Sequence, residues 1–275
     1  METDKRATAL YSFDPYTFGL FLLAFYAIPY PIYRFIAHRL KWETNPKTMS
    51  RHWSDLFDGI SYGLILFIFG NYSNTLRLSS WITVAAFYPS LFGYALIAEL
   101  PFTKTSLPNI KNWPKGMWAV FITAVAIILV FAGYHIYLGY LLPMPFVIYY
   151  ISCLSIPAVI LASSFLLSKE VNQNWCRTKL YSWKTRNINK NATQQNQEQA
   201  DEGTTLLPVA ATPQSAHNPY TRQVAIHLHH WQIFYVLAFF TRFDHPVSQV
   251  GAGIVLACYM EGICAYGYDR LVNDG

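Results

Sequence analysis

Long apolar runs separated by short polar stretches dominate the chain. Seven of them approach the length of a membrane-crossing helix, which needs about 20 predominantly apolar residues. They lie approximately over residues 16–35, 54–72, 79–99, 117–140, 145–167, 226–243 and 246–266. The pattern predicts an all-α, polytopic transmembrane helix bundle with seven spans. The last two runs are shorter and more polar, so a re-entrant hairpin with five or six spans in total is the alternative.

The composition agrees with a membrane protein. Apolar residues make up 53% of the 275 residues and charged residues 13%, about half the charged share of a soluble domain. Aromatic residues reach 17%, which suits a chain with many anchors at the membrane interface. The net charge of +5 comes from basic residues in the short loops. Topology explains that distribution better than phosphate binding, so we expect no nucleic-acid partner.

The positions of Lys and Arg predict the orientation. Sixteen of the 20 fall in the first, third and fifth loops and the C-terminal tail, and four fall on the opposite side. Basic loops remain in the cytosol. The sequence therefore predicts an N-terminus that is outside or lumenal and a cytosolic C-terminus.

Three regions follow from this pattern. Residues 1–167 form a five-span membrane region, and residues 226–275 form a C-terminal two-helix membrane hairpin. Between them, residues 168–225 are expected to be a disordered cytosolic linker. The centre of the linker, Asn187–Ala200, is rich in Asn and Gln and has too few apolar residues to bury a core.

The linker contains a candidate sorting signal. Glu202 is followed, after three residues, by Leu206 and Leu207, a spacing that resembles acidic dileucine signals for endosomes and lysosomes. Such a peptide offers one charge and two adjacent apolar side chains to a clathrin-adaptor-type protein. A chance match is the alternative. An endosomal, lysosomal or vacuolar membrane is therefore expected, with the plasma membrane as the other location.

Three histidines, His227, His229 and His230, stand at the start of the sixth segment. The apolar stretch after them ends at Phe240, so a spanning helix must start near Ile226 and draw the imidazoles into the membrane edge. Ionisable groups at that depth are costly and are candidates for function.

Carboxylates reach the same side of the membrane from other segments. Imidazoles and carboxylates that converge from separate helices suit a divalent metal such as zinc or iron. Glu261 recurs at four-residue spacing with Gly253, Ala257 and Ala265, a small-residue face that packs against a neighbouring helix. The metal candidates are His227, His229, His230, Glu261 and Asp269, and the further polar cluster is Asp55, Asp58 and Glu99.

Structural polar packing or lipid contact is the alternative to a metal site. His227 and His230 share a helical face, whereas His229 points about 200° away from His227. We expect His227, His230 and Glu261 to form one inward-facing site, with Glu261 hydrogen-bonded to a histidine even when no metal is bound. His135 and the pair Asp244–His245 lie on the opposite side.

The C-terminal region resembles that of fungal LCCL-domain membrane proteins. The resemblance rests on the His-x-His-His-Trp box at residues 227–231, the segment Phe239–Phe243, and the segment Glu261–Asp269. The chain has no insertion large enough for the LCCL domain itself. The resemblance therefore implies a polytopic membrane protein without an assigned reaction.

The sequence offers no Gly-rich phosphate loop, nucleophile elbow or HExxH motif. We expect a non-enzymatic multi-pass membrane protein that engages lipid or protein partners. A metal-dependent hydrolase or oxidoreductase that acts on lipid at the cytosolic leaflet is the alternative.

A tag inserted near Gln195 should be cytosolic, because the fifth loop carries the largest share of the basic residues. Protease protection or glycosylation mapping measures this. A lumenal tag would overturn both the orientation and the sorting-signal argument.

Overall fold

The computed structural model describes residues 13–70, 81–101, 103, 112–144, 146–200, 218–220, 222–241 and 243–274. The chain is mostly helical. It divides into two compact units, of which the first comprises Met1–Pro157 and Leu228–Asp269, and the second Ala158–His227 and Arg270–Gly275.

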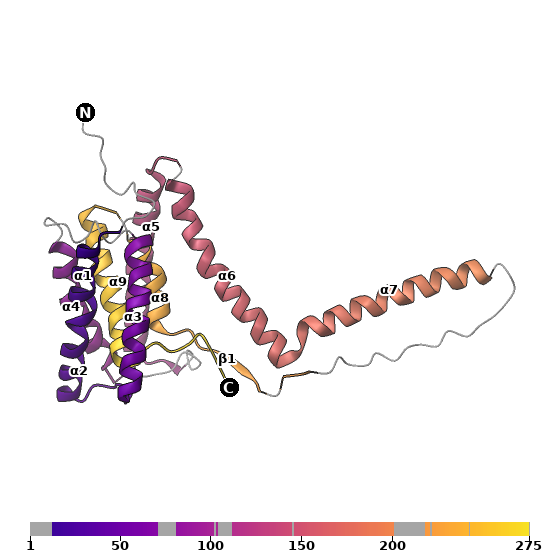
Figure 1. Ribbon diagram of the computed structural model, residues 1–275, viewed down its shortest axis with the longest axis horizontal. Helices are drawn as coiled ribbons and strands as arrows, with labels where there is room; N and C mark the ends of the chain where they lie inside the picture. The colour runs from indigo at the N-terminus through magenta and orange to yellow at the C-terminus, as the bar shows by residue number, and fades with distance from the viewer. Residues whose placement is uncertain are drawn as a thin grey trace. The chain divides into compact units, whose positions relative to one another are not determined.

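The first unit is a helical bundle (Figure 1). Its first helical stretch is continuous but includes a π-helical turn, η1, between α1 and α2. The unit contains α1 (Pro15–Leu22), η1 (Leu23–Ala27), α2 (Pro29–Leu40), α3 (Met49–Phe69), α4 (Trp81–Ala98), α5 (Lys115–Tyr140), the start of α6 (Phe146–Gln173), α8 (His230–Ala238) and α9 (Pro246–Ala265).

Helix α9 forms the core of the first unit. Fifteen of its 20 residues are buried, and both α4 and the shorter α8 pack against it (Figure 1). Small residues let the neighbouring backbones approach closely, as in other membrane bundles. Gly253 is the tightest point, because a Cβ there would lie 2.6 Å from the Thr83 carbonyl oxygen and 2.7 Å from the Ala86 Cβ.

The second unit combines the end of α6 with α7 (Trp175–Ala200) and a short antiparallel strand pair. Strand β1 (Val224–Ile226) pairs with β2 (Val272–Asp274). The side-chain amide of Asn172 both donates to the Val224 carbonyl and accepts from the Val224 N–H, at 2.8 Å each. This double hydrogen bond ties the strand pair to the end of α6.

Among the described residues, five helical stretches are long and apolar enough to cross a membrane, as expected of an integral membrane protein. They are Pro15–Leu40, Trp81–Ala98, Lys115–Tyr140, Tyr150–Gln173 and Pro246–Ala265. Many apolar side chains of α5 are exposed in the structure, which a lipid environment explains.

Two expectations about segment structure need correction. The sixth segment does not start as a helix near Ile226, because β-pairing holds residues 224–226 extended and the helix begins only at His230. At 9 residues and about 1.5 Å per residue, α8 is too short to span the membrane alone. The predicted linker is also not wholly irregular, since α7 is helical over Trp175–Ala200.

Replacing Gly253 with Ala should lower the stability of the bundle by about 1–3 kcal/mol, because backbone atoms of α4 cannot move away independently of their helix. Thermal unfolding of the detergent-solubilised protein, followed by tryptophan fluorescence, measures the change. Gly93→Ala is the matched control, since a Cβ at Gly93 meets nothing within 4 Å. Equal melting temperatures for the two variants would contradict the close approach of α4 and α9.

Candidate functional site

The carbonyl groups at the C-terminal end of α9 are bound by groups from α2 and from the loop between α2 and α3. The last four carbonyls of a helix have no partner within it, and burying one unpaired costs about 1–3 kcal/mol. Lys47 Nζ donates to the Ile263 carbonyl at 2.7 Å. Arg34 Nη1 donates to the Cys264 carbonyl at 3.2 Å.

Backbone N–H groups bind the remaining two carbonyls. Asn45 donates to the Ala265 carbonyl at 2.9 Å, and Tyr266 and Gly267 both donate to the Gly262 carbonyl. The cations that bind this end also interact favourably with the negative end of the helix dipole. Arg34 on α2 and the α2–α3 loop therefore cap α9 together.

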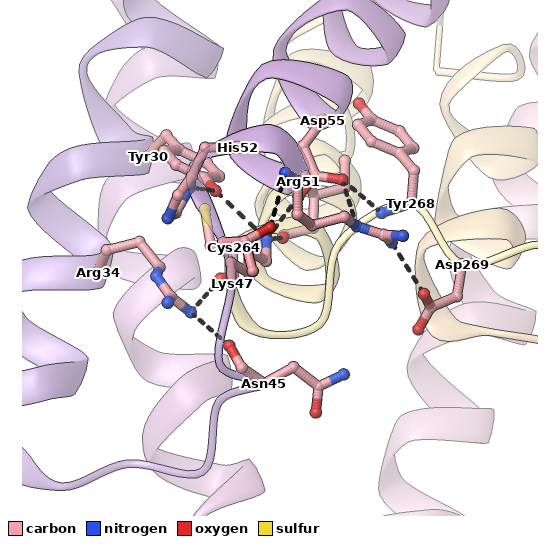
Figure 2. A network of polar contacts seen from close by, with 12 residues as sticks. Tyr30, Arg34, Asn45, Lys47, Arg51, His52, Asp55, Cys264, Tyr268 and Asp269 are labelled. Atoms are coloured by element: carbon pink, nitrogen blue, oxygen red, sulfur yellow. Dashed lines mark hydrogen bonds and ion pairs between the residues drawn. The ribbon is translucent and has the colours of Figure 1, made fainter.

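Asp55, on α3, is the anionic centre of this cap (Figure 2). Its side chain is almost completely buried, as is that of Lys47, and Lys47 Nζ lies 2.9 Å from Asp55 Oδ2. Arg51 Nε lies 3.1 Å from Asp55 Oδ1, and the Tyr268 N–H donates to the same oxygen at 3.3 Å. One carboxylate thus links the α2–α3 loop, α3 and the segment that follows α9.

A second carboxylate extends the network toward the surface. Asp269 Oδ1 lies 2.9 Å from Arg51 Nη2, and both side chains are partly exposed. Figure 2 shows Arg51 between Asp55 and Asp269. Gly267 allows the chain to turn there, because it has a φ of +94° and a Cβ would lie 2.9 Å from Arg51 Nη2 and from Asp55 Oδ2.

Tyrosines supply further hydrogen bonds around the charges. The Tyr26 hydroxyl donates to the Asp55 carbonyl, and the Tyr30 hydroxyl lies 2.8 Å from His52 Nδ1. Lys47 Nζ is also 3.3 Å from the Tyr30 hydroxyl. Burial lowers the pKa of Lys47, and the adjacent Asp55 carboxylate opposes that shift. Each charged side chain of the network therefore has a partner within the protein.

Glu261 is buried, as its small-residue face predicts, but its hydrogen-bond partner differs from the expected histidine. The Tyr33 hydroxyl donates to Glu261 Oε1 at 3.0 Å. His230 Nδ1 lies 3.5 Å from the Tyr94 hydroxyl. His229 is the N-cap of α8, and its N–H donates to the Gln232 side chain at 3.0 Å.

His227 belongs to the second unit, where its N–H donates to the Leu271 carbonyl at 2.9 Å. The sequence predicts that His227 and His230 share a helical face. This prediction is wrong, because His227 precedes the first residue of α8. In the described ranges, no three His, Cys, Asp or Glu side chains are grouped as ligands for one ion. The metal site stays a prediction.

The remaining polar residues that the sequence singles out do not form one cluster with Asp55 among the described residues. Asp58 is half-buried one turn after Asp55 on α3. Glu99, at the end of α4, accepts a hydrogen bond of 2.6 Å from the Glu43 N–H. The sorting-signal residues Glu202, Leu206 and Leu207 lie outside the described residues.

A second polar cluster lies at the start of α9. His135 Nε2, on α5, is 2.9 Å from the Ser248 hydroxyl, and His135 Nδ1 is 2.7 Å from the Phe131 carbonyl. Asp244 accepts a 2.9 Å hydrogen bond from the Gln249 side chain. His135 and Ser248 are both buried, so this pair joins α5 to α9 inside the protein.

Sequence reasoning missed Lys47, Arg34, Tyr33 and Tyr268. Lys47 and Arg34 counted only as topogenic loop charges, and no local motif marks them as helix caps. Their role depends on carbonyls more than 200 residues later in the chain.

Comparisons with family models, curated proteins and solved structures each find no match.

Asp55→Asn should lower the free energy of unfolding by about 3–5 kcal/mol, because it leaves a buried ammonium without its carboxylate. Lys47→Met should also lower the free energy of unfolding. The double variant should lose less free energy of unfolding than the two single variants lose together, by about 0.5–3 kcal/mol, because the two groups are coupled. Unfolding of the solubilised protein completes this double-mutant cycle.

Asp58→Asn is the matched control, and it should change the free energy of unfolding by about 0.5 kcal/mol or less. Additive effects of Asp55→Asn and Lys47→Met would show that the ion pair does not stabilise the cap.

Proposed function

We propose that the protein is a non-enzymatic, multi-pass membrane protein that engages lipid, and protein partners, at the cytosolic side of the membrane. The observation that carries this proposal is the internal pairing of the charged network. Lys47 and Arg34 bind the end of α9, and Asp55 binds Lys47 and Arg51. These groups stabilise the bundle and leave little capacity to bind a substrate.

A pocket beside α9, lined by described residues, offers little room for a ligand. It has a volume of about 10 Å³ and an almost entirely apolar lining that includes Phe21, Leu66 and Leu256. A volume of that order is near the lower limit for one water molecule. Engagement of lipid at the protein surface is therefore favoured over a reaction inside this cavity.

The proposed topology keeps seven crossings, with α3 and a broken α8 segment added to the five long apolar stretches. Trp231, at the start of α8, lies against Gly262, near the end of α9. Phe243 hydrogen-bonds to Ser248, near the start of α9. The chain between Trp231 and Phe243 thus follows nearly the full length of α9. Non-helical backbone is tolerated at membrane depth where protein buries it.

The proposal includes an outside or lumenal N-terminus and a cytosolic C-terminus, supported by the charge distribution. It also includes delivery to an endosomal, lysosomal or vacuolar membrane by adaptor proteins that read Glu202, Leu206 and Leu207. The plasma membrane is the alternative location.

The metal-dependent enzyme is the second candidate, and the burial of Glu261 is the observation that favours it. A buried carboxylate on the central helix is unusual and often functional. In this alternative, zinc or iron would use ligands from His227, His229, His230, Glu261 and Asp269.

Purified full-length protein should retain phospholipid and contain far less than one zinc or iron ion per chain. Mass spectrometry of co-purified lipid and elemental analysis measure these two quantities. Glu261→Gln should leave the metal content unchanged, because Glu261 pairs with Tyr33. One ion per chain in the wild type, lost in Glu261→Gln, would establish the metal site and overturn the non-enzymatic proposal.

A further inference from the structure

Helix α7 exposes a concentration of cations and aromatic rings just after a candidate membrane span. Residues 175–190 contain five Lys or Arg and no acidic residue. Trp183 and Leu180 are each 64% exposed, and Lys179, Lys184 and Arg186 are exposed beside them. The span that precedes this region ends at Gln173, so the exposed residues begin within a few residues of the membrane.

The junction between α6 and α7 has a defined direction. Asn174 interrupts the helix with a φ of 51°, and Figure 1 shows the chain changing direction between α6 and α7. Glu170 holds the new helix, because its Oε2 accepts from the Cys176 N–H at 2.6 Å and its Oε1 lies 3.4 Å from Arg177 Nε. The β1–β2 pair, bound to Asn172, supports the same junction. The direction of α7 is therefore set relative to the end of α6.

The arrangement of side chains around α7 is typical of a helix that lies in the headgroup layer of a membrane. The cations and aromatic rings are interleaved rather than separated on two faces; Arg177 and Lys184 alternate with Leu180, Tyr181 and Trp183. Trp and Tyr favour the interface, where an apolar ring and a polar edge are both accommodated. Lys and Arg extend their charged ends to phosphate groups while their stems remain near apolar surface.

The charge of this region decides which lipid it suits. Arg177 pairs with Glu170, whereas Lys179, Lys184 and Arg186 are exposed. These exposed cations would repel one another at a neutral surface, whereas anionic headgroups neutralise them. Each juxtamembrane cation contributes about 1 kcal/mol at an anionic membrane surface, or about fivefold in binding. The covalent link to α6 keeps α7 close to that surface, so weak individual contacts act at high effective concentration.

We propose that residues 175–190 of α7 bind anionic phospholipid headgroups of the cytosolic leaflet. This inference rests on the proposed lipid-engaging function and names the class of lipid. The cations supply selectivity for anionic headgroups, and Trp175, Tyr181 and Trp183 supply the interfacial anchor.

Full-length protein in nanodiscs tests the proposal, with discs of phosphatidylcholine alone or with about 30% phosphatidylserine. Hydrogen–deuterium exchange of the α7 amides is the readout. Anionic discs should slow exchange over residues 175–190 by about tenfold or more, and about 0.5 M NaCl should weaken the effect by screening. The α7 variant replaces Lys179, Lys184 and Arg186 with Gln, and should show little difference between the discs.

The matched control replaces three other exposed cations, Arg39, Lys41 and Lys115, with Gln. It removes the same charge near other helix ends and should retain the response to phosphatidylserine. Both variants should give wild-type exchange in α9, which shows that the bundle is folded.

Equal α7 protection in neutral and anionic discs would overturn the selectivity for anionic lipid but keep lipid engagement by α7. No α7 protection in either disc would overturn the inference itself. The proposed function would then be judged separately, by the co-purified lipid and the metal content.

Discussion

The structure of the bundle depends on the hydrogen bonds made by the carbonyl groups at the C-terminal end of α9. A buried helix end exposes carbonyl oxygens that no intrahelical N–H can reach, and a membrane interior supplies little water for them. Arg34 binds one of these carbonyls from α2, and Lys47 and the Asn45 backbone bind two others from the α2–α3 loop. The central helix therefore needs a segment more than 200 residues earlier in the chain to complete it.

Asp55 makes that cap electrically balanced. Without it, the buried Lys47 ammonium would face the neutral Ile263 carbonyl and Tyr30 hydroxyl instead of a carboxylate, and the desolvation cost of such an ion is several kcal/mol. The same carboxylate binds Arg51 and the Tyr268 backbone, so it also fixes the segment after α9. One ion pair thus joins the first helices of the chain to its C-terminal region, and gives the network a structural explanation that does not require a ligand.

The two units point to different roles for charge. In the bundle, the charged groups of the cap are paired with one another or with the end of α9, so they stabilise tertiary structure. On α7, Lys179, Lys184 and Arg186 are exposed near aromatic rings and follow a candidate membrane span, so they suit contact with headgroups. The proposed function follows from that difference, because binding at a surface requires exposed charge whereas a stable bundle requires paired charge.

The sequence by itself determined the helical membrane class, most of the apolar segments and the burial of Glu261, because hydropathy and four-residue spacing report how each helix meets an apolar environment. It did not determine whether lipid or the protein interior surrounds each apolar helix. Lipid and the protein interior both favour apolar side chains. Hydropathy therefore predicts a membrane span both for α5, which has many exposed residues, and for α9, which is buried. Only the tertiary structure decided that α8 begins at His230, that Tyr33 binds Glu261, and that Lys47 caps α9. Those partners are distant in sequence, and their pairing depends on the three-dimensional approach of helices that local patterns do not encode.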